Sequence, residues 1–321
     1  MRRVALIYNP VSGQHPEKRV AQIADVTAVL RGAGIEVKAI ATDLPESAGR
    51  LAREAVGEGY DTILACGGDG TVHEALQNLV GGTAALGVIP MGTANALASD
   101  LGLPISPVKA VKMLLDAVPV RISVGRVFFQ DTKGNPGSRY FIVAAGVGAD
   151  ALFLSGLDAR LKRRFGYALY LVEGFRVWAT HSFPMFAASF FENGSKSPRV
   201  LETSQLLVVR ISDFGGLLHN LVPGAALNNE SLRAIAFKTR SRLDYLRFLV
   251  AVLFARHTFS RKVELVDANT VECRDLNGSP ARLFVEADGE LLGTLPVKIE
   301  VVPQALTLLI PAKALNRKLH P

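Results

Sequence analysis

A short stretch near residue 70 constrains the fold more than any other part of the chain. It runs Ile63-Leu64-Ala65-Cys66-Gly67-Gly68-Asp69-Gly70-Thr71-Val72-His73-Glu74. An apolar strand leads into glycines and one carboxylate, and a helix-like pattern follows. Glycine has no Cβ, so the backbone can turn sharply and bring its N–H groups close to another molecule. The first N–H groups of the helix lack partners within it, and together with the helix dipole they favour an anion such as a phosphate.

The carboxylate inside this glycine loop is unusual, because an acid repels a bare phosphate. Its presence fits a contact between Asp69 and a metal ion, a metal-bound water or a ribose hydroxyl. The alternative is a tight strand-to-helix turn in which Asp69 is the N-cap residue. Short glycine loops occur in proteins of many functions, so the loop alone leaves both interpretations open.

Composition excludes several classes of protein. The chain has 321 residues, 49% of them hydrophobic and 20% charged, which suits two domains better than one. Two cysteines make no disulfide framework and favour a reducing, cytosolic setting. We find no apolar run long enough for a signal peptide or a membrane-spanning helix. The net charge of +7 suits nucleic acid, anionic lipid or phosphate ligands without choosing among them.

The first third of the chain alternates strands and helices. Strands are expected at 4–8, 36–41, 62–65 and 86–90, and helices at 17–31, 45–56, 71–80, 96–101 and 107–117. This alternation predicts a doubly wound, mainly parallel sheet. Ligands bind such sheets beyond the carboxyl ends of the strands. The polar loops 9–13, 67–70 and 92–95 each follow a strand, so we expect them at one edge.

The pattern changes near residue 120. Strands are expected at 122–129, 140–145, 185–191, 205–211, 232–237, 262–266, 270–274, 282–286, 297–302 and 306–310. Asn-Gly pairs at 193–194 and 277–278 predict hairpin turns, and helical insertions are expected at 158–180 and 241–255. We therefore predict an N-terminal doubly wound α/β domain over 1–118 and an antiparallel β-sandwich over 119–311. The basic tail, 312–321, is expected to return to the first domain.

Four motifs follow one another in a recognisable order. They are Asn9-Pro10-Val11-Ser12-Gly13, Gly67-Gly68-Asp69-Gly70-Thr71-Val72-His73-Glu74, Pro90-Met91-Gly92-Thr93-Ala94-Asn95-Ala96-Leu97-Ala98 and Asp288-Gly289-Glu290. In order and spacing they resemble the diacylglycerol kinase catalytic-domain superfamily of soluble lipid kinases, which includes bacterial diacylglycerol kinases and sphingosine and ceramide kinases. The resemblance implies an NAD-kinase-like α/β domain followed by a β-sandwich.

The resemblance also implies a chemistry. It predicts an ATP-dependent lipid kinase whose acceptor is diacylglycerol, ceramide or a sphingoid base, with ATP and Mg²⁺ as cofactors. The phosphates would be cradled by the first two motifs, Thr42 would contact the nucleotide, and Thr93 and Asn95 would complete the pocket. The implied nucleotide-binding residues are Asn9, Pro10, Val11, Ser12, Gly13, Thr42, Gly67, Gly68, Asp69, Gly70, Thr71, Val72, His73, Glu74, Thr93 and Asn95. Magnesium would be bound mainly by the nucleotide, with Asp69 as the metal-facing carboxylate.

A candidate general base lies near the end of the chain. Asp288 and Glu290 flank Gly289 between two apolar runs. Phosphoryl transfer needs alignment, a cation to spread charge and a group that receives the hydroxyl proton. We favour Asp288 for the proton, with Glu290 as a rival or an orienting partner. The alternative is a hairpin turn with exposed acids.

Three positions depart from the family pattern. Many bacterial members carry an aspartate at the position of Ala96 and another near Ser123. Many also hold a structural magnesium ion on an Asp-Asp-Gly-x-Leu turn, where this chain reads Asn228-Asn229-Glu230-Ser231-Leu232. We therefore expect fewer carboxylates in the network linked to magnesium, and no structural metal at the turn 228–232.

Other features bear on partners. The basic, apolar stretch 158–178 is either an interfacial element for anionic lipid or a surface helix packed on the sandwich. We predict that the partner is a lipid substrate at a membrane surface. The protein is expected to be cytoplasmic and peripherally associated with the membrane. Cys66 is expected to pack at a strand end, and His73 to be a helix residue without a catalytic role. His181, His219 and His257 lack the spacing of metal ligands.

Two further functions remain open from the sequence. A kinase of a soluble alcohol such as NAD shares the Gly-Gly-Asp-Gly loop, although the first motif and the apolar insertions argue against it. A nucleotide-binding membrane adaptor without turnover is supported by the missing carboxylates at positions 96 and 123. No nucleic-acid partner is expected, because the chain lacks a recognised module and is only 7% aromatic. A sheet edge in either domain offers a route to a homodimer.

Overall fold

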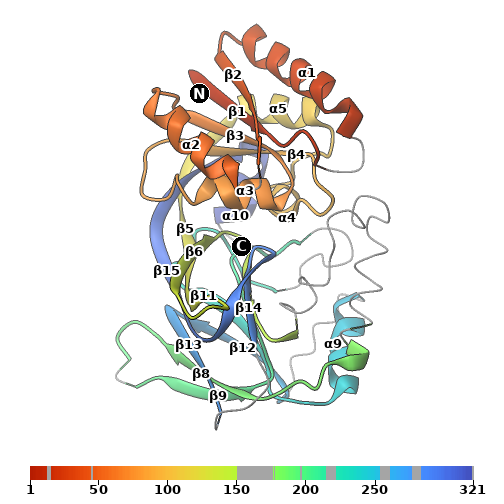
Figure 1. Ribbon diagram of the computed structural model, residues 1–321, viewed down its shortest axis with the longest axis vertical. Coiled ribbons are helices and arrows are strands. Elements are labelled where there is room, and N and C mark those ends of the chain that lie inside the picture. The colour runs from red at the N-terminus through yellow and green to blue at the C-terminus, as the bar shows by residue number, and fades with distance from the viewer. Residues whose placement is uncertain are drawn as a thin grey trace. The chain divides into compact units, whose positions relative to one another are not determined.

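The computed structural model describes residues 1–12, 16–44, 46–149, 176, 178–195, 197–214, 222–253, 261–276 and 283–319. The chain divides into two compact units (Figure 1). Unit 1 comprises Met1–Val124, Ala226–Asn228 and Pro303–Pro321, and unit 2 comprises Gly125–Ala225 and Asn229–Val302.

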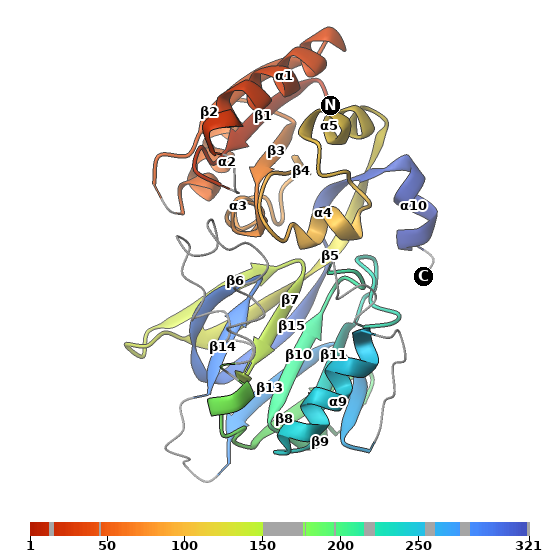
Figure 2. The same ribbon diagram turned by 90° about the vertical axis from the view of Figure 1, so that its right-hand side faces the viewer.

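Unit 1 is a parallel sheet covered by helices. Its elements are β1 (Arg3–Tyr8), the 3-10 helix η1 (Pro16–Lys18), α1 (Arg19–Gly32), β2 (Glu36–Ala41), α2 (Ser47–Gly57), β3 (Thr62–Gly67), α3 (Asp69–Leu76), β4 (Ala85–Pro90), α4 (Ala96–Asp100), α5 (Pro107–Leu115), the start of β5 (Ala117–Gln130), the end of β15 (Glu290–Pro311) and α10 (Ala312–Leu319). The strand order is β2-β1-β3-β4-β15, and these pairs are parallel. Helices α1 and α5 pack together on one face of the sheet, and α2 and α3 on the other (Figures 1 and 2).

Two central strands show why the chain folds this way. Every residue of β3 and of β4 is buried. A strand with helices on both faces must be apolar on both sides, so it reads as a continuous apolar run without alternation. This confirms the predicted doubly wound α/β fold.

The register of this sheet brings the strand ends to one level. Tyr8 at the end of β1 pairs with Cys66 of β3 and with Ala41 of β2. Gly67 at the end of β3 pairs with Pro90 of β4. The loops after these four strands therefore begin at the same edge of the sheet, as predicted.

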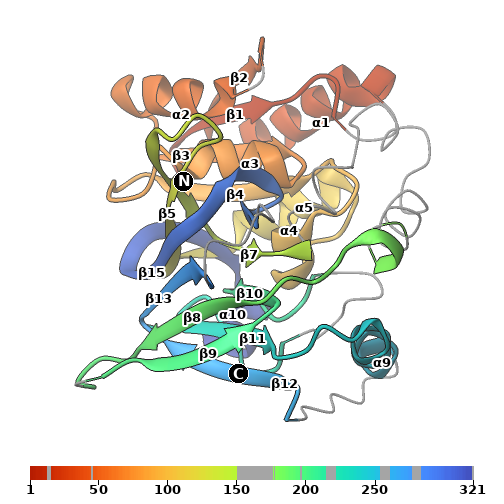
Figure 3. The same cartoon turned by 60° about the horizontal axis from the view of Figure 1, so that its bottom comes forward.

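Unit 2 is antiparallel. Its remaining elements are β6 (Pro136–Phe141), β7 (Ala144–Val147), β8 (Phe186–Phe191), β9 (Arg199–Thr203), β10 (Gln205–Val209), β11 (Leu232–Phe237), α9 (Arg242–Leu253), β12 (Val263–Ala268), β13 (Thr270–Asp275) and β14 (Phe284–Ala287). The path runs β12-β11-β10-β7-β14-β15, with β13, β8 and β9 continuing from β15 and β5–β6 as a further pair. Figure 3 shows β8 and β9 side by side. Alternate side chains from these strands meet in one core, which confirms the predicted antiparallel β domain.

Several predicted elements need correction. The strands expected at 297–302 and 306–310 are one strand, β15. The strand continues through residues 303–305, and Arg121 donates to the Gln304 carbonyl at 2.9 Å. The strand β9 was not predicted, and α2 begins at Ser47, two residues later than expected.

The helix α9 lies where a helical insertion was expected, and the Asn193-Gly194 pair lies in the connection between β8 and β9. Most of the helix expected at 158–180 and the turn at 277–278 fall outside the described residues. Within the described ranges, no helix is both long enough and apolar enough to cross a membrane.

Candidate functional site

The candidate site of unit 1 is the rim, defined here as residues 9–12, 42, 67–74 and 91–95 at the carboxyl edge of the sheet. The first loop of the rim is a tight turn. The Asn9 side chain accepts a hydrogen bond from the Val11 N–H at 3.0 Å, and its carbonyl accepts from the Ser12 hydroxyl at 3.1 Å. An asparagine that bonds to the backbone two residues on fixes such a turn locally. The Pro10 ring further limits its backbone freedom.

The second and third loops of the rim touch through their glycines. A Cβ atom on Gly92 would lie 2.3 Å from the Gly68 Cα atom, and the Met91 N–H donates to the Gly67 carbonyl at 2.8 Å. Carbon atoms normally approach no closer than about 3.5 Å. Only glycine therefore allows these two loops to lie against each other.

Asn95 closes the third loop. Its side chain accepts from the Gly92 N–H at 2.8 Å and donates to the Gly92 carbonyl at 3.0 Å. Its φ angle is +53°, a conformation that asparagine adopts more readily than most residues. Asn95, predicted as a nucleotide contact, thus has a side chain that shapes the loop.

Asp69 links the glycine loop to α4. Its carboxylate accepts from the Asn95 N–H at 3.0 Å and from the Ala96 N–H at 2.7 Å. These are N-terminal N–H groups of α4, where a carboxylate is favoured by both hydrogen bonding and the helix dipole. Asp69 therefore caps α4. The alternative interpretation, in which Asp69 is the N-cap of the helix that follows the loop, is wrong, because that position is Gly68 and α3 begins at Asp69. The caps connect residues that are 26 and 27 positions apart.

Glu74 performs the same task for another helix. From α3, its carboxylate accepts the Glu46 N–H at 3.1 Å and the Ala48 N–H at 3.0 Å, at the start of α2. The two acids of the glycine motif thus hold two different helices against α3. A nucleotide contact by Glu74 stays a prediction.

We expect Glu74→Gln to lower the free energy of unfolding by about 1 kcal/mol, because the amide replaces one acceptor at the start of α2 by a donor. The Kd for nucleotide should change by less than about twofold if Glu74 acts only as a cap. Urea unfolding and nucleotide titration measure the two quantities. A large change in nucleotide affinity at unchanged stability would instead indicate direct contact.

Arg19 is a residue of this site that the sequence analysis missed. Its guanidinium donates to the Ser12 carbonyl at 2.5 Å and to the Met91 carbonyl at 3.0 Å, so it ties the first loop to the third. It is 4% exposed, and burial lowers the pKa of its guanidinium. A cation thus lies beneath the rim. The partners are 7 and 72 positions away, so no local pattern could have revealed them.

The other predicted residues of the rim have simpler surroundings. Thr42 follows β2, and its N–H donates to the Tyr8 carbonyl at 2.9 Å. Thr93 is half-buried, while Thr71 and His73 are buried within α3. Cys66 is fully buried at the end of β3, where burial raises the pKa of its thiol, which confirms the packing role.

Asp288 is tightly held within unit 2. Its carboxylate accepts three backbone N–H groups, from Ile142 at 2.9 Å, Val143 at 2.9 Å and Ala144 at 3.0 Å. Its φ angle is +48° and it stands between β14 and β15. Three donors on one carboxylate fix its position and orientation. The alternative interpretation is right about the hairpin turn, which joins the antiparallel strands β14 and β15. It is wrong about the exposure of Asp288, which is half-buried and bonded.

The neighbouring acids differ from Asp288. Glu290 is half-exposed, and its carboxylate lies 4.0 Å from the Arg139 guanidinium, a loose ion pair. Glu286 is 3% exposed and accepts the Gly289 N–H at 3.0 Å. It supports the turn that carries Asp288. Glu286 was not predicted from the sequence, because its bond to the Gly289 N–H depends on the turn that follows β14.

Metal ligands are sparse. Within the described ranges, no group of three or more His, Cys, Asp or Glu side chains could hold a metal ion. Asp69 is the only acid among residues 9–12, 67–70 and 91–95. Each of its carboxylate oxygens already accepts a backbone N–H at α4, which leaves only the second lone pair of each oxygen for a metal ion or a metal-bound water. This donor set fits a magnesium ion that is held mainly by phosphate oxygens and waters.

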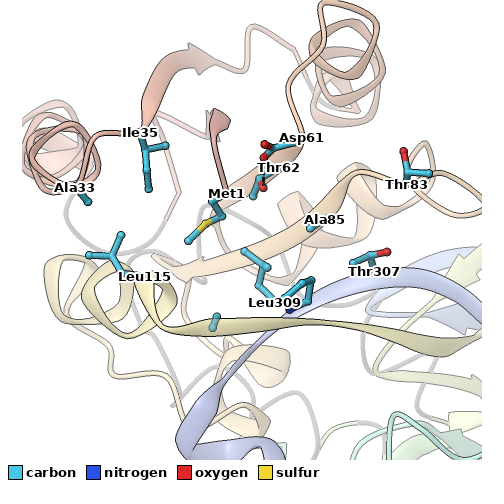
Figure 4. Close-up of a pocket in the computed structure, with 12 residues that line it drawn as sticks. Met1, Ala33, Ile35, Asp61, Thr62, Thr83, Ala85, Leu115, Thr307 and Leu309 are labelled. Carbon is cyan, nitrogen blue, oxygen red and sulfur yellow. Dashed lines mark hydrogen bonds between the residues drawn. The ribbon is translucent and has the colours of Figure 1, made fainter.

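A cavity of about 440 Å³ lies elsewhere in unit 1 (Figure 4). Met1, Thr62 and Ala85 line it, at the amino ends of β1, β3 and β4. Asp61 at its wall accepts the Arg2 N–H at 2.9 Å. The cavity therefore belongs to the edge of the sheet opposite to the rim.

Two family models match separate parts of the chain. Residues 3–127 match the model of the diacylglycerol kinase catalytic domain. Residues 142–310 match that of the YegS C-terminal NAD kinase beta sandwich-like domain.

Individual proteins are similar over nearly the whole chain. The chain is 30% identical to a protein named diacylglycerol kinase from Mycobacterium tuberculosis, over 96% of this chain and 95% of that one. It is 28% identical to one of the same name from Bacillus subtilis strain 168, over 92% of each.

Among solved structures, a crystal structure of a diacylglycerol kinase from Bacillus anthracis covers 97% of this chain and 98% of its own, with 19% identity and a TM-score of 0.69. Yeast NADH kinase complexed with NADH covers 96% of this chain and 83% of its own, with 11% identity and a TM-score of 0.50. At these identities the two structures show a shared fold.

Proposed function

The chain belongs to the diacylglycerol kinase catalytic-domain family and is a kinase, and we propose that it transfers the γ-phosphate of ATP to the hydroxyl group of a lipid alcohol. Diacylglycerol, ceramide and sphingoid bases are the acceptors considered. The observation that carries the proposal is the rim of unit 1. Its loops follow β1, β3 and β4 and are braced into one arrangement by Asp69, Arg19 and the Gly68–Gly92 contact.

The rim supports the binding of a triphosphate. The N-terminus of α3 directs backbone N–H groups towards the loop, and a helix N-terminus favours an anion. Braced loops bind with less loss of conformational freedom than mobile ones. Gly68 and Gly70 add no side chain that would keep a phosphate away. Magnesium, in this proposal, is held mainly by the phosphates with Asp69 as the protein carboxylate, and it would spread the charge of the transferred group.

Asp288 is the proposed general base. The reaction requires a carboxylate beside the acceptor hydroxyl, and a base works best when its position is fixed. The three N–H groups that bind Asp288 provide that fixation. Glu290 is the rival, and its exposure and loose ion pair leave it less well fixed.

The first test is phosphate transfer from labelled ATP to a panel of lipid alcohols in mixed micelles, with Asp288→Asn and Glu290→Gln as a matched pair. We expect Asp288→Asn to lower kcat by about 10²–10⁴-fold, the usual contribution of a general base. Glu290→Gln should lower kcat by less than about tenfold. The KM for ATP should change little in either variant.

Because Asp288 also binds backbone N–H groups, the unfolding of both variants is measured alongside activity. An Asp288→Asn protein that is folded and as active as the wild type would remove the proposed base. A large loss in Glu290→Gln alone would transfer the role to Glu290.

A second candidate function is nucleotide binding without turnover. Ala96 supports it, because many bacterial members have a carboxylate where this chain offers only a backbone N–H to Asp69. Tight binding of ATP, together with no transfer to any alcohol of the panel, would favour this function over catalysis.

A further inference from the structure

The helix α9 of unit 2 exposes an apolar stripe. Leu243, Leu246 and Val250 are 59%, 41% and 42% exposed, although large aliphatic side chains usually lie inside. Their spacing places them within an arc of about 60° on the helix, at 100° per residue. Single exposed apolar residues are common, but three on one stripe form a patch.

The opposite side of α9 is firmly attached to unit 2. The Tyr245 ring stacks on Phe237 of β11 at 4.7 Å and on Phe183 at 4.2 Å, and Phe248 meets the Phe237 ring edge-on at 5.0 Å. The Tyr245 hydroxyl lies 2.8 Å from the Ser204 hydroxyl. Figure 2 shows α9 outside the strands of unit 2. The stripe therefore stays on the outside because the helix cannot roll without breaking this aromatic stack.

The acid of α9 is turned away from the stripe. Asp244 is 8% exposed and accepts from the Thr239 hydroxyl at 2.8 Å and from the Lys262 ammonium at 3.0 Å. These bonds, led by that of Lys262, lower the pKa of Asp244, so it remains ionised and paired near neutral pH. Its charge is compensated locally.

Cations flank the stripe on both sides. Arg242 and Arg247 lie on either edge of it by helical spacing. Arg247 is 74% exposed, and its guanidinium also lies 3.5 Å from the Asp244 carboxylate, so this acid is shared between Arg247 and Lys262. Over residues 239–253 and 261–262 there are five cations, namely Arg240, Arg242, Arg247, Arg261 and Lys262, and one acid, Asp244. An apolar stripe bordered by arginines is the composition of a helix that lies in the surface of an anionic membrane.

We propose that the exposed stripe of α9, with its flanking arginines, docks unit 2 on an anionic lipid surface. Leu243, Leu246 and Val250 enter the boundary between head groups and acyl chains, while Arg242 and Arg247 contact lipid phosphates. The proposal deepens the proposed function, since it names the surface on which a lipid kinase would meet its acceptor. It concerns binding only and involves no chemical step.

The test is co-sedimentation of the full chain with vesicles of phosphatidylglycerol or of phosphatidylcholine. The wild type should bind phosphatidylglycerol vesicles, and the binding should weaken at high salt because the arginine contacts are screened. The variant Leu243→Glu/Val250→Glu should bind at least tenfold more weakly. The matched control is Ile105→Glu/Val200→Glu, which places the same charges at side chains that are 84% and 57% exposed elsewhere. The control should bind like the wild type.

A second measurement separates docking from catalysis. Phosphate transfer to a short-chain, water-soluble alcohol should be unchanged in the α9 variant, while transfer to acceptor in vesicles falls with binding. If vesicle binding depends on α9 but no alcohol is phosphorylated, the docking proposal is supported and the proposed kinase function is contradicted. Unchanged vesicle binding by the α9 variant overturns docking, whatever the activity. Docking is also overturned if the wild type binds neither kind of vesicle. The same holds if the α9 variant changes only the oligomeric state, as measured by light scattering.

Discussion

Replacing Gly92 by alanine should weaken the proposed nucleotide binding at the rim and lower phosphate transfer by at least about 10²-fold. The new Cβ atom would lie 2.3 Å from the Gly68 Cα atom and 2.9 Å from the Asn95 side-chain oxygen. The second and third loops must then separate by more than about 1 Å to restore ordinary contact. A misplacement of about 1 Å in a site that works by alignment can cost 10²-fold in rate, and we expect a loss of at least that size.

Gly92→Ala should also lower the free energy of unfolding. Forcing an extra methyl group between two packed backbones costs about 1–3 kcal/mol. Isothermal titration with ATP and urea unfolding measure the two effects separately. Both are expected in Gly92→Ala, because the contact between the loops links them.

Gly70→Ala is the matched control for Gly92→Ala. It adds the same methyl group in the same rim, at a position where a Cβ atom meets nothing within 4 Å. Its stability should equal that of the wild type. A loss of nucleotide affinity in Gly70→Ala at unchanged stability would mean that the phosphates approach this glycine. A Gly92→Ala protein with normal stability and normal affinity would contradict the contact between the loops.

Replacing Arg210 by methionine should lower the free energy of unfolding by about 2–4 kcal/mol. Arg210 is 1% exposed, and its guanidinium donates to the Ser231 carbonyl at 2.6 Å and to the Asn229 carbonyl at 2.7 Å. Methionine fills a similar space but leaves both part-buried carbonyls without this donor. An acceptor that loses its donor in a buried setting costs about 1–3 kcal/mol. The variant no longer buries a charged guanidinium, so it avoids the desolvation cost of that charge. This gain offsets part of the loss.

Arg210 also bears on the structural metal of the family. Burial lowers the pKa of Arg210 to about 10, so the side chain is still a cation at neutral pH. It binds the turn 228–232, where many bacterial members carry the acids of a magnesium site. We therefore expect no structural metal at this turn, and a chelator should leave the unfolding midpoint of the wild type unchanged.

Two variants control the Arg210 experiment. Arg210→Lys keeps the charge but offers a single ammonium group for two carbonyls, and its stability should lie between those of methionine and arginine. Arg199→Met removes an arginine whose side chain is 52% exposed, and should change stability by about 0.5 kcal/mol or less. An Arg210→Met protein as stable as the wild type, or a chelator that lowers the midpoint, would contradict this account.

The glycine motif shows which parts of the site were predictable. The strand, the sharp turn and the helix at 62–76 depend on neighbours in the chain, so apolar periodicity and glycine position predicted them. The roles of Asp69 and Glu74 depend on partners more than twenty positions away. The residue types indicated a functional role for these two acids. The helices that they cap can be identified only in the folded structure.

Asp288 shows the same limit over a longer distance. Its motif suggested a functional carboxylate, yet its three N–H donors lie about 145 positions earlier. The buried cations Arg19 and Arg210 were missed altogether, because a charged residue in an amphipathic stretch is usually solvated. Burial of such a group can be recognised only when its acceptors are known.

By itself, the sequence determined the two-part architecture and the convergence of the loops at one edge, because hydrophobic period and chain order fix strand direction and layer. It also determined that α9 is a helix. The tertiary structure alone decided which groups brace the loops and which side of α9 faces solvent. Hydrogen-bond partners distant in sequence, and the aromatic stack on Phe237, are set by packing, and packing leaves no local trace in the order of residues.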